Sequence, residues 1–307
     1  MTGGRTLGAR LRRYRLLYLM MVPAVVYLFV FKYMPIFGLM TAFRDYHPTM
    51  GLRGFFTAPW IGFKNFRVFF GSIYAGQILA NTVIISGLKI AFIFPAPIVL
   101  ALMINEMQNT VFQRSIQTVT YLPHFISWVV IGGILFDMLS ISSGSLNILL
   151  ERLIGHRVDF LGNPGAFRWI LVVSEMWKEV GWGSIVYLAA IAGIDTELYE
   201  AASIDGAGHF RQVWHVTLPG LLPTVTVLFL LRIAAILDAG FEQILVLYSP
   251  PVYGVADILD TYVYRVGMTQ GRYGVATAAG LFKSVIGFAM VVGANKLVRL
   301  TGQKGLY

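Results

Sequence analysis

The sequence predicts an all-α membrane protein with six transmembrane helices. Of its 307 residues, 57% are hydrophobic and only 13% are charged, and the mean hydropathy is +0.70. A water-soluble globule of this size could not cover that much apolar surface with polar residues. The apolar residues are also concentrated in runs of about 20 or more, the length of helix that crosses a bilayer core.

The first span, 16–43, follows a basic segment, 1–15, that contains five arginines and no acidic residue. A cleavable signal peptide begins in the same way. However, apolar residues continue past Lys32 through Phe43 and no convincing pair of small residues marks a cleavage site. These features favour an uncleaved first helix.

Five further runs are long enough to cross the bilayer with some tilt, at about residues 78–104, 115–139, 167–192, 221–247 and 275–298. They define a transmembrane domain over 16–299 and a tail, 300–307. An even number of spans puts both termini on one side. The arginine-rich start and the closing Lys296, Arg299 and Lys304 predict that this side is the cytoplasm. Segments 44–75, 140–166 and 248–273, rich in turn formers, are then external loops, and 105–114 is a cytoplasmic turn.

Several functions are disfavoured by what the sequence lacks. It contains no cysteine, so a disulfide framework and a thiolate metal site are ruled out, and we expect no bound metal. The net charge of +9 does not form an interleaved basic and aromatic surface, which argues against nucleic-acid binding. No G-x-x-x-x-G-K-[ST] loop is present, so we expect no cofactor on this chain, and any ATP and its magnesium must be bound by another chain.

The cytoplasmic segment 193–220 is too long and too patterned to be a simple connector. Asp195 or Thr196 can cap a short helix, and Gly206 with Gly208 permits the reversal that ends it. A second helix is expected from about His209 until Pro219. Its apolar stripe, which a membrane surface or a partner groove could bury, consists of Phe210, Val213 and Trp214.

The order Glu200-Ala201-Ala202, Gly206 and Val216-x-Leu218-Pro219 resembles the EAA loop of permeases from binding-protein-dependent ABC importers, including its spacing. The resemblance implies the type I importer permease fold, in which this loop forms coupling helices that sit in a groove of the ATPase subunit. The coupling residues it implies here are Glu200, Ala201, Ala202, Asp205, Gly206, Phe210, Val213, Leu218 and Pro219.

Three other stretches extend the resemblance to carbohydrate-type permeases. They are Ile61-Gly-Phe-Lys-Asn65-Phe66, Leu122-Pro123-His124 and the segment from Trp177 to Trp182. The subgroup that they resemble imports complex oligosaccharides, with alginate-type and aldouronate-type permeases the nearest likeness. The resemblance implies a non-catalytic subunit of the bacterial inner membrane, paired with a second permease, two ATPase subunits and an extracytoplasmic solute-binding protein. The cargo that the resemblance implies is a uronate-containing or related oligosaccharide.

Charged residues inside spans are costly and usually face a bundle interior or a wet cavity. On the fourth span, one stripe suited to a sugar path holds Glu175, Lys178, Glu179 and Trp182. On the fifth span, roughly one side holds Arg232, Asp238, Glu242 and Gln243. Arg232, together with Lys283 of the sixth span, is a candidate to bind acidic sugar units.

Each of these groups also has a purely structural interpretation. Glu175 could pair with Lys178, and Arg232 with Asp238 or Glu242, in seams between helices. Lys89 of the second span could snorkel or contact a partner, and His124 is more typical of a hydrogen-bonded structural residue than of a proton relay.

Two other classes of protein remain open at this stage. A proton- or sodium-coupled carrier would use Asp238 or Glu242 as its coupling site, and a membrane-embedded sugar- or lipid-modifying enzyme would use the carboxylates as acid and base. Neither alternative explains the loop 193–220, and neither requires an ATPase that copurifies.

Overall fold

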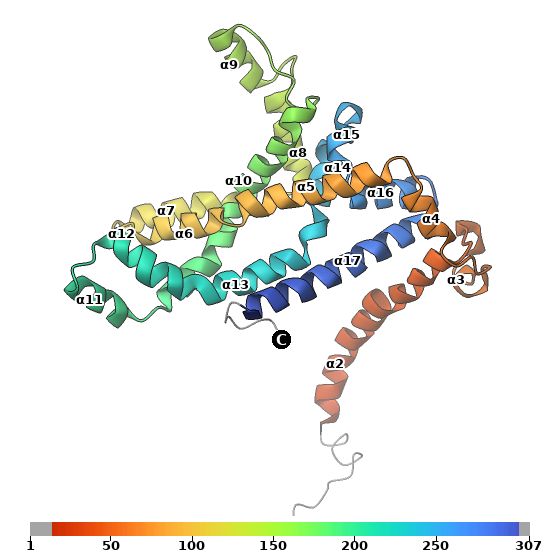
Figure 1. Cartoon of the computed structure of the whole chain (residues 1–307), viewed down its shortest axis with the longest axis horizontal. Coiled ribbons are helices and arrows are strands. Elements are labelled where there is room, and N and C mark those ends of the chain that lie inside the picture. Colours follow the sequence, from red (N-terminus) through yellow and green to blue (C-terminus); the bar gives the residue numbers. More distant parts are fainter. Residues whose placement is uncertain (1–13, 301–307) are drawn as a thin grey trace, which may run out of the picture. The chain divides into compact units, whose positions relative to one another are not determined.

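A computed structural model describes residues 14–300 of the chain (Figure 1). Within this range every regular element is helical, and the one strand-like contact is an isolated bridge between Arg44 and Trp60. The prediction of an all-α protein is therefore confirmed. The tail and most of the basic N-terminal segment lie outside the described residues. The chain divides into two compact units, Met1–Gly71 with Val263–Leu281, and Ser72–Tyr262 with Phe282–Tyr307.

The first unit begins with the predicted first span. Helix α2 (Arg15–Leu28) continues through a π-helical turn (Phe29–Tyr33) and a 3-10 helix (Met34–Phe43), and these form one run long and apolar enough to cross a bilayer. The π-helical turn precedes Pro35, whose ring cannot donate a hydrogen bond and would crowd the carbonyl one turn earlier. The local widening of the helix accommodates this proline.

The rest of the first unit consists of short helices with a cluster of aromatic rings between them. These are a 3-10 turn (Pro48–Met50), α3 (Gly54–Thr57), α4 (Lys64–Phe70) and a π-helical turn (Arg265–Thr269) that leads towards α17 (Tyr273–Leu300). Phe43 stacks on Trp60 with ring centroids 5.5 Å apart, meets Phe63 edge-on and contacts Phe66 at a tilt of 42°. The Arg44 guanidinium donates to the Phe56 and Ala58 carbonyls at 2.7 Å, which ties α3 to the end of the first span.

In the second unit, α5 (Ala75–Ile93) and α6 (Ala96–Asn105) form the apolar run predicted at 78–104. Helix α7 (Thr110–Tyr121), a 3-10 turn (Leu122–Phe125) and α8 (Trp128–Leu139) cover the run predicted at 115–139. They are not one straight helix, because the chain bends by 101° between Phe125 and Trp128. Pro123 lies in the tight 3-10 turn, and Ser127 caps α8 with its side chain, so the helix ends and restarts here.

Helix α10 (Pro164–Ala192) is the long central helix of the second unit and packs against α5, α6, α7 and α13 (Leu218–Ala234). It follows α9 (Ser145–Ile154) and covers the span predicted at 167–192 (Figure 1). Close packing on α7 depends on Gly181, because a Cβ at this position would collide with the Thr120 backbone carbonyl. A side chain of any size would push these two helices apart.

Two expectations about the following segment are wrong. After α11 (Thr196–Ile204), the helix that starts with α12 (His209–Gln212) does not stop at Pro219, but continues through a π-helical turn (Val213–Thr217) into α13. Pro219 has no amide hydrogen to donate, and the wider π-helical turn before it lets the helix continue past the proline. The predicted span 221–247 is instead interrupted, because α13 ends at Ala234 and α14 begins at Phe241.

Within residues 14–300, four helical runs are long and apolar enough to cross a membrane, or five when the bent α7–α8 pair is included. Helix α10 has sufficient length, but Arg168, Glu175, Lys178 and Glu179 interrupt its apolar character. The number of six spans therefore stays a prediction. The remaining elements are a 3-10 turn (Pro250–Val252), α15 (Tyr253–Ala256) and α16 (Leu259–Tyr264).

Candidate functional site

A buried ionic network connects three helices of the second unit. Glu175 of α10 forms ion pairs with Lys89 of α5 and with Arg232 of α13, the latter at 3.0 Å. Lys89 is only 2% exposed, and its ammonium also donates to the Gln243 side chain at 2.6 Å and to the Ala239 carbonyl at 2.8 Å. Two cations thus share one carboxylate, which leaves an excess of positive charge beside Arg232.

The break between α13 and α14 supplies two of these contacts. Ala239 and Gly240 both adopt left-handed backbone conformations, with φ angles of +46° and +83°. This reversal presents the Ala239 carbonyl to Lys89 and returns the chain so that Gln243 reaches the same ammonium. A Cβ on residue 240 would collide with the lysine, so the position requires glycine.

A cavity of about 520 Å³, a size that suits a small-molecule ligand, lies beside this network in the second unit. Its lining combines charged groups with aromatic rings, namely Glu175, Glu179, Arg232, Trp128, Trp182 and Tyr187. The Arg232 side chain is partly exposed while Glu175 is buried, so the guanidinium is the more accessible half of this ion pair. Aromatic faces pack on sugar rings and a guanidinium can bind a carboxylate, which makes the cavity suitable for an acidic sugar.

The charged stripe predicted on α10 divides into two groups with different roles. Lys178 is buried and donates to the carbonyls of His124 and Ile126, the second at 2.8 Å, so that it holds the bend between α7 and α8. Glu179 and Trp182 line the cavity, and both contact His124: its ring nitrogen lies 2.9 Å from the Glu179 carboxylate and its ring stacks on Trp182 at 4.6 Å. The expected Glu175–Lys178 pair does not form, because each side chain has partners on another segment.

Replacing Lys178 with methionine should lower stability, because the two carbonyls at the bend would lose their charged donor. Hydrogen bonds to charged groups contribute about 1.5–3 kcal/mol each, and the buried ammonium offsets part of that gain by its own desolvation. We expect a lower midpoint of thermal unfolding for the detergent-solubilised protein. Arg211→Met on exposed α12 is the control; equal midpoints for K178M and the wild type would contradict the assigned role.

The residues predicted to share one side of the fifth span are separated by the helix break. Arg232 pairs with Glu175 rather than with Asp238 or Glu242. Asp238 instead accepts from Lys283 at 2.5 Å, and the same lysine binds Asp260 at 2.7 Å. Glu242 is exposed. Of this group only Arg232 lines the cavity, and Lys283 is already held between two carboxylates.

The sequence did not predict the role of Lys89. Its side chain does not snorkel to the membrane surface but pairs with Glu175, and it is the most buried charged residue of the ionic network. The sequence also did not predict the role of Trp128, which starts α8 and lines the cavity. The available signal was the position of Lys89 in the middle of an otherwise apolar run, since such a charge needs a partner inside the protein.

The loop 193–220 folds as two helices joined by a tight turn. Asp195 caps α11 by accepting from the Glu197 amide at 3.0 Å, and Gly206 reverses the chain with a φ of +75°. Gly208 has an ordinary φ and begins α12. Gln212 donates to the Ser203 hydroxyl at 2.8 Å, which clips the two helices together.

The outer surface of this loop exposes large apolar side chains. Ile204 is 86% exposed, Phe210 80% and Trp214 61%, and the rings of Phe210 and Trp214 lie parallel at 6.5 Å. The sequence-predicted coupling residues Glu200, Ala201, Asp205, Gly206 and Pro219 are exposed as well, whereas Ala202, Val213 and Leu218 are half-buried. Ile204, which the motif does not include, is part of the same exposed surface.

With this fold and this loop established, the chain belongs to a defined class of transporter subunit. Residues 93–301 match the family of binding-protein-dependent transport system inner membrane components. The chain is therefore a member of that permease family, as the EAA-like loop predicted. Membership places it among inner membrane proteins, and relatives of this kind are permeases rather than catalytic subunits.

Individual relatives are similar over nearly the whole chain. Protein LplB of Bacillus subtilis (strain 168) is 43% identical over 100% of this chain and 96% of its own length. The polygalacturonan/rhamnogalacturonan transport system permease protein YteP of the same strain is 40% identical over 97% and 92%. A chain in the crystal structure of a bacterial ABC transporter involved in the import of the acidic polysaccharide alginate superposes with a TM-score of 0.89. It is 42% identical and covers 96% of this chain and 99% of its own. The predicted importer permease fold is thus confirmed.

Proposed function

We propose that this chain is one permease subunit of an ATP-driven importer that carries uronate-containing oligosaccharides across the inner membrane. The observation that carries the cargo assignment is the 520 Å³ cavity that combines Arg232 with Trp128 and Trp182. A uronate oligosaccharide presents carboxylates, hydroxyls and apolar ring faces, and this lining offers a partner for each. The relatives whose names mention polygalacturonan and alginate support the same class of cargo.

Arg232 gives the cavity a means to recognise the carboxylate. Its guanidinium already donates to one carboxylate, that of Glu175, and its planar fork has five donors, so that others can serve a second carboxylate. Lys89 also pairs with Glu175, and Lys178 lies 3.7 Å from Glu179. Three cations thus meet two carboxylates, so a cargo carboxylate beside Arg232 would meet a net positive site. The charge of the network therefore favours an anionic sugar over a neutral one.

The coupling loop supports the second half of the proposal. An exposed surface of Ile204, Phe210 and Trp214 would be unfavourable in water unless a partner covers it. In our proposal, the ATPase subunit of the importer receives this surface, and closure of the ATPase pair shifts the permease between two packings. A second permease completes the pore, an external binding protein delivers the sugar, and both termini lie in the cytoplasm. The cation-coupled carrier and the membrane enzyme account for neither the loop nor the family.

Import by the complete complex in proteoliposomes tests this proposal. Tetramers of galacturonate, mannuronate and guluronate would be supplied outside with the cognate binding protein, and uptake and ATP hydrolysis would be followed together. We expect uptake of at least one acidic tetramer, coupled to hydrolysis, and weaker uptake of its carboxyl-reduced neutral form. Arg232→Gln should reduce this preference for the acidic form, whereas Arg114→Gln, outside the cavity, should preserve it. Failure of any ATPase to copurify would refute the importer assignment.

A further inference from the structure

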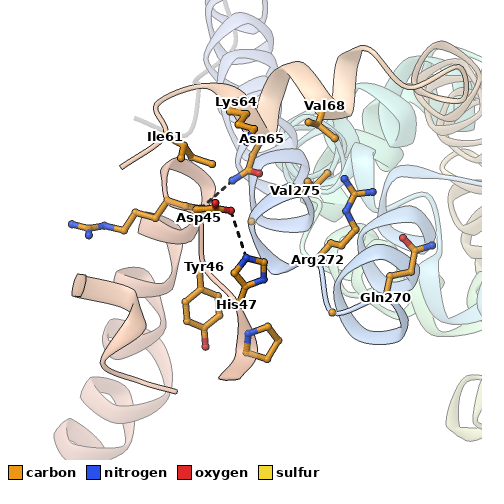
Figure 2. A pocket seen from close by; sticks show the side chains of 14 residues that line it. Asp45, Tyr46, His47, Ile61, Lys64, Asn65, Val68, Gln270, Arg272 and Val275 are labelled. Atoms are coloured by element: carbon orange, nitrogen blue, oxygen red, sulfur yellow. Dashed lines mark hydrogen bonds and ion pairs between the residues drawn. The ribbon is translucent and has the colours of Figure 1, made fainter. Parts of the chain in front are cut away.

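A second cavity, of about 450 Å³, lies in the first unit and has no place in the site described above. Figure 2 shows that its lining comes from three segments: the chain that follows the first span, helix α4, and the turn that leads into α17. Asp45, Tyr46 and His47 come from the first segment, Lys64 and Asn65 from the second, and Gln270 and Arg272 from the third.

Asn65 holds these segments in place. Its amide donates to the carbonyls of Thr41, Ala42 and Arg44 at 3.3, 3.0 and 3.3 Å. Gly274, at the start of α17, packs so closely on this amide that a Cβ would lie only 2.5 Å from the nitrogen. The floor of the cavity is therefore built by a specific side chain and a close backbone approach, and is not a gap between loops.

The cavity is positively charged. Arg44, Lys64 and Arg272 line it against a single carboxylate, that of Asp45, so the formal charge is 3 − 1 = +2 with His47 neutral. Arg44 is fixed by two backbone carbonyls and Asp45 lies 3.8 Å from His47. Lys64 and Arg272 are exposed, and neither has an acidic partner among residues 14–300. Two cationic side chains are thus available to an anionic ligand.

The position along the chain suggests which ligand enters. The lining residues lie directly after the first span and directly before the last, in the two segments that are external in the proposed topology. In the same topology an odd number of spans separates the coupling loop from each of these segments, three from 44–75 and one from 248–273, so the loop lies at the other face of the membrane. An oligosaccharide released outside by a binding protein would meet this basic cavity before it enters the membrane.

We propose that this cavity is an entry subsite that binds a carboxylate-bearing sugar unit, with Lys64 and Arg272 as the contacts to the carboxylate. The inference rests on the proposed function and deepens it. Tyr46 and the amide of Gln270 provide a ring face and a donor for the rest of the sugar. The volume of the cavity falls in the range of small-molecule sites. It is larger than the space that one carboxylate side chain from a protein loop would fill.

The test compares the double variant K64Q/R272Q with R53Q/R67Q in the complete complex. Arg53 and Arg67 are exposed cations of the same unit that do not line the cavity, so the control removes equal charge. For the acidic tetramers, K64Q/R272Q should raise the KM for uptake about tenfold, since losing a charge-assisted contact costs about 1.4 kcal/mol or more. It should leave the KM for carboxyl-reduced tetramers within about twofold of the wild type, as R53Q/R67Q should for both.

Three outcomes would overturn the entry subsite. The double variant could import acidic tetramers with the wild-type KM, or it could raise the KM for acidic and neutral tetramers alike. It could also weaken docking of the cargo-free binding protein, measured by surface plasmon resonance, which would assign the cavity to a carboxylate of that protein. In all three cases the wild type still imports acidic tetramers. Loss of the proposed function itself would instead appear as a wild type that imports none.

Discussion

Substituting Glu175 with alanine is expected to destabilise the folded chain strongly. The change leaves the Lys89 ammonium buried without its carboxylate, and it deprives Arg232 of the same partner. Removing one member of a buried ion pair costs about 3–5 kcal/mol. We expect the midpoint of thermal unfolding, followed by size-exclusion chromatography in detergent, to fall by on the order of 10 °C.

Two variants separate a loss of charge balance from a loss of packing. Lys89→Met with Glu175→Gln removes both charges of the most buried pair and should recover at least half of the lost stability. Glu179→Gln alters a partly exposed carboxylate one turn along the same helix and should have little effect. An alanine variant that unfolds at the wild-type temperature would show that the network does not stabilise the chain.

Replacing Ile204 with aspartate is expected to abolish association with the ATPase while the chain stays folded. The side chain is 86% exposed at the end of α11, so the substitution removes no internal contact. In a complex, the same change would bury an unpaired charge at an apolar contact, which costs several kcal/mol. The measurement is the amount of ATPase that copurifies with the tagged permease, which should fall at least tenfold for a loss of about 1.4 kcal/mol or more.

Ile73 provides a matched control for this experiment. It is also 86% exposed, but it lies directly before α5, on the external face in the proposed topology. Ile73→Asp should therefore retain the ATPase, although it introduces the same charge. If I204D and I73D copurify equal amounts of ATPase, the exposed surface of the loop is not the docking surface.

Much of the fold could be predicted because hydrophobic length and capping are local properties. The runs at 16–43, 78–104 and 275–298 match helices within a few residues, and Asp195 caps α11 as its position suggested. The turn at Gly206 was also predictable, since a positive φ there strongly favours glycine.

The remaining differences arise from tertiary contacts that a hydrophobic run does not encode. The bend at 125–128 is held by Lys178, which lies some fifty residues later in the chain. The break after Ala234 depends on two left-handed residues that face Lys89. Both interruptions occur inside apolar runs that satisfy every length criterion, so hydropathy alone predicts continuous spans.

In the candidate site too, local properties could be predicted from the sequence and tertiary contacts could not. Of the stripe predicted on the fourth span, Glu179 and Trp182 line a cavity, whereas Lys178 donates to the bend between α7 and α8; Asp238, predicted on the fifth span, pairs with Lys283. Spacing identifies which residues share a face of one helix, and cannot identify which partner on another helix each side chain finds. The ion pair between Arg232 and Glu175 joins two helices, and only the structure reveals it.

The unbroken helix from His209 to Ala234 has a mechanical consequence. Phe210 and Arg232 stand on one rod, and 22 residues at about 1.5 Å each separate them by about 33 Å along its axis. Pushing one end of such a rod moves the other, with the π-helical turn as its softest joint. In the proposed function, linkage is reciprocal: if docking at Phe210 changes how Arg232 binds a cargo carboxylate, a carboxylate bound at Arg232 changes docking at Phe210 to the same degree, so the cargo would signal its arrival to the ATPase.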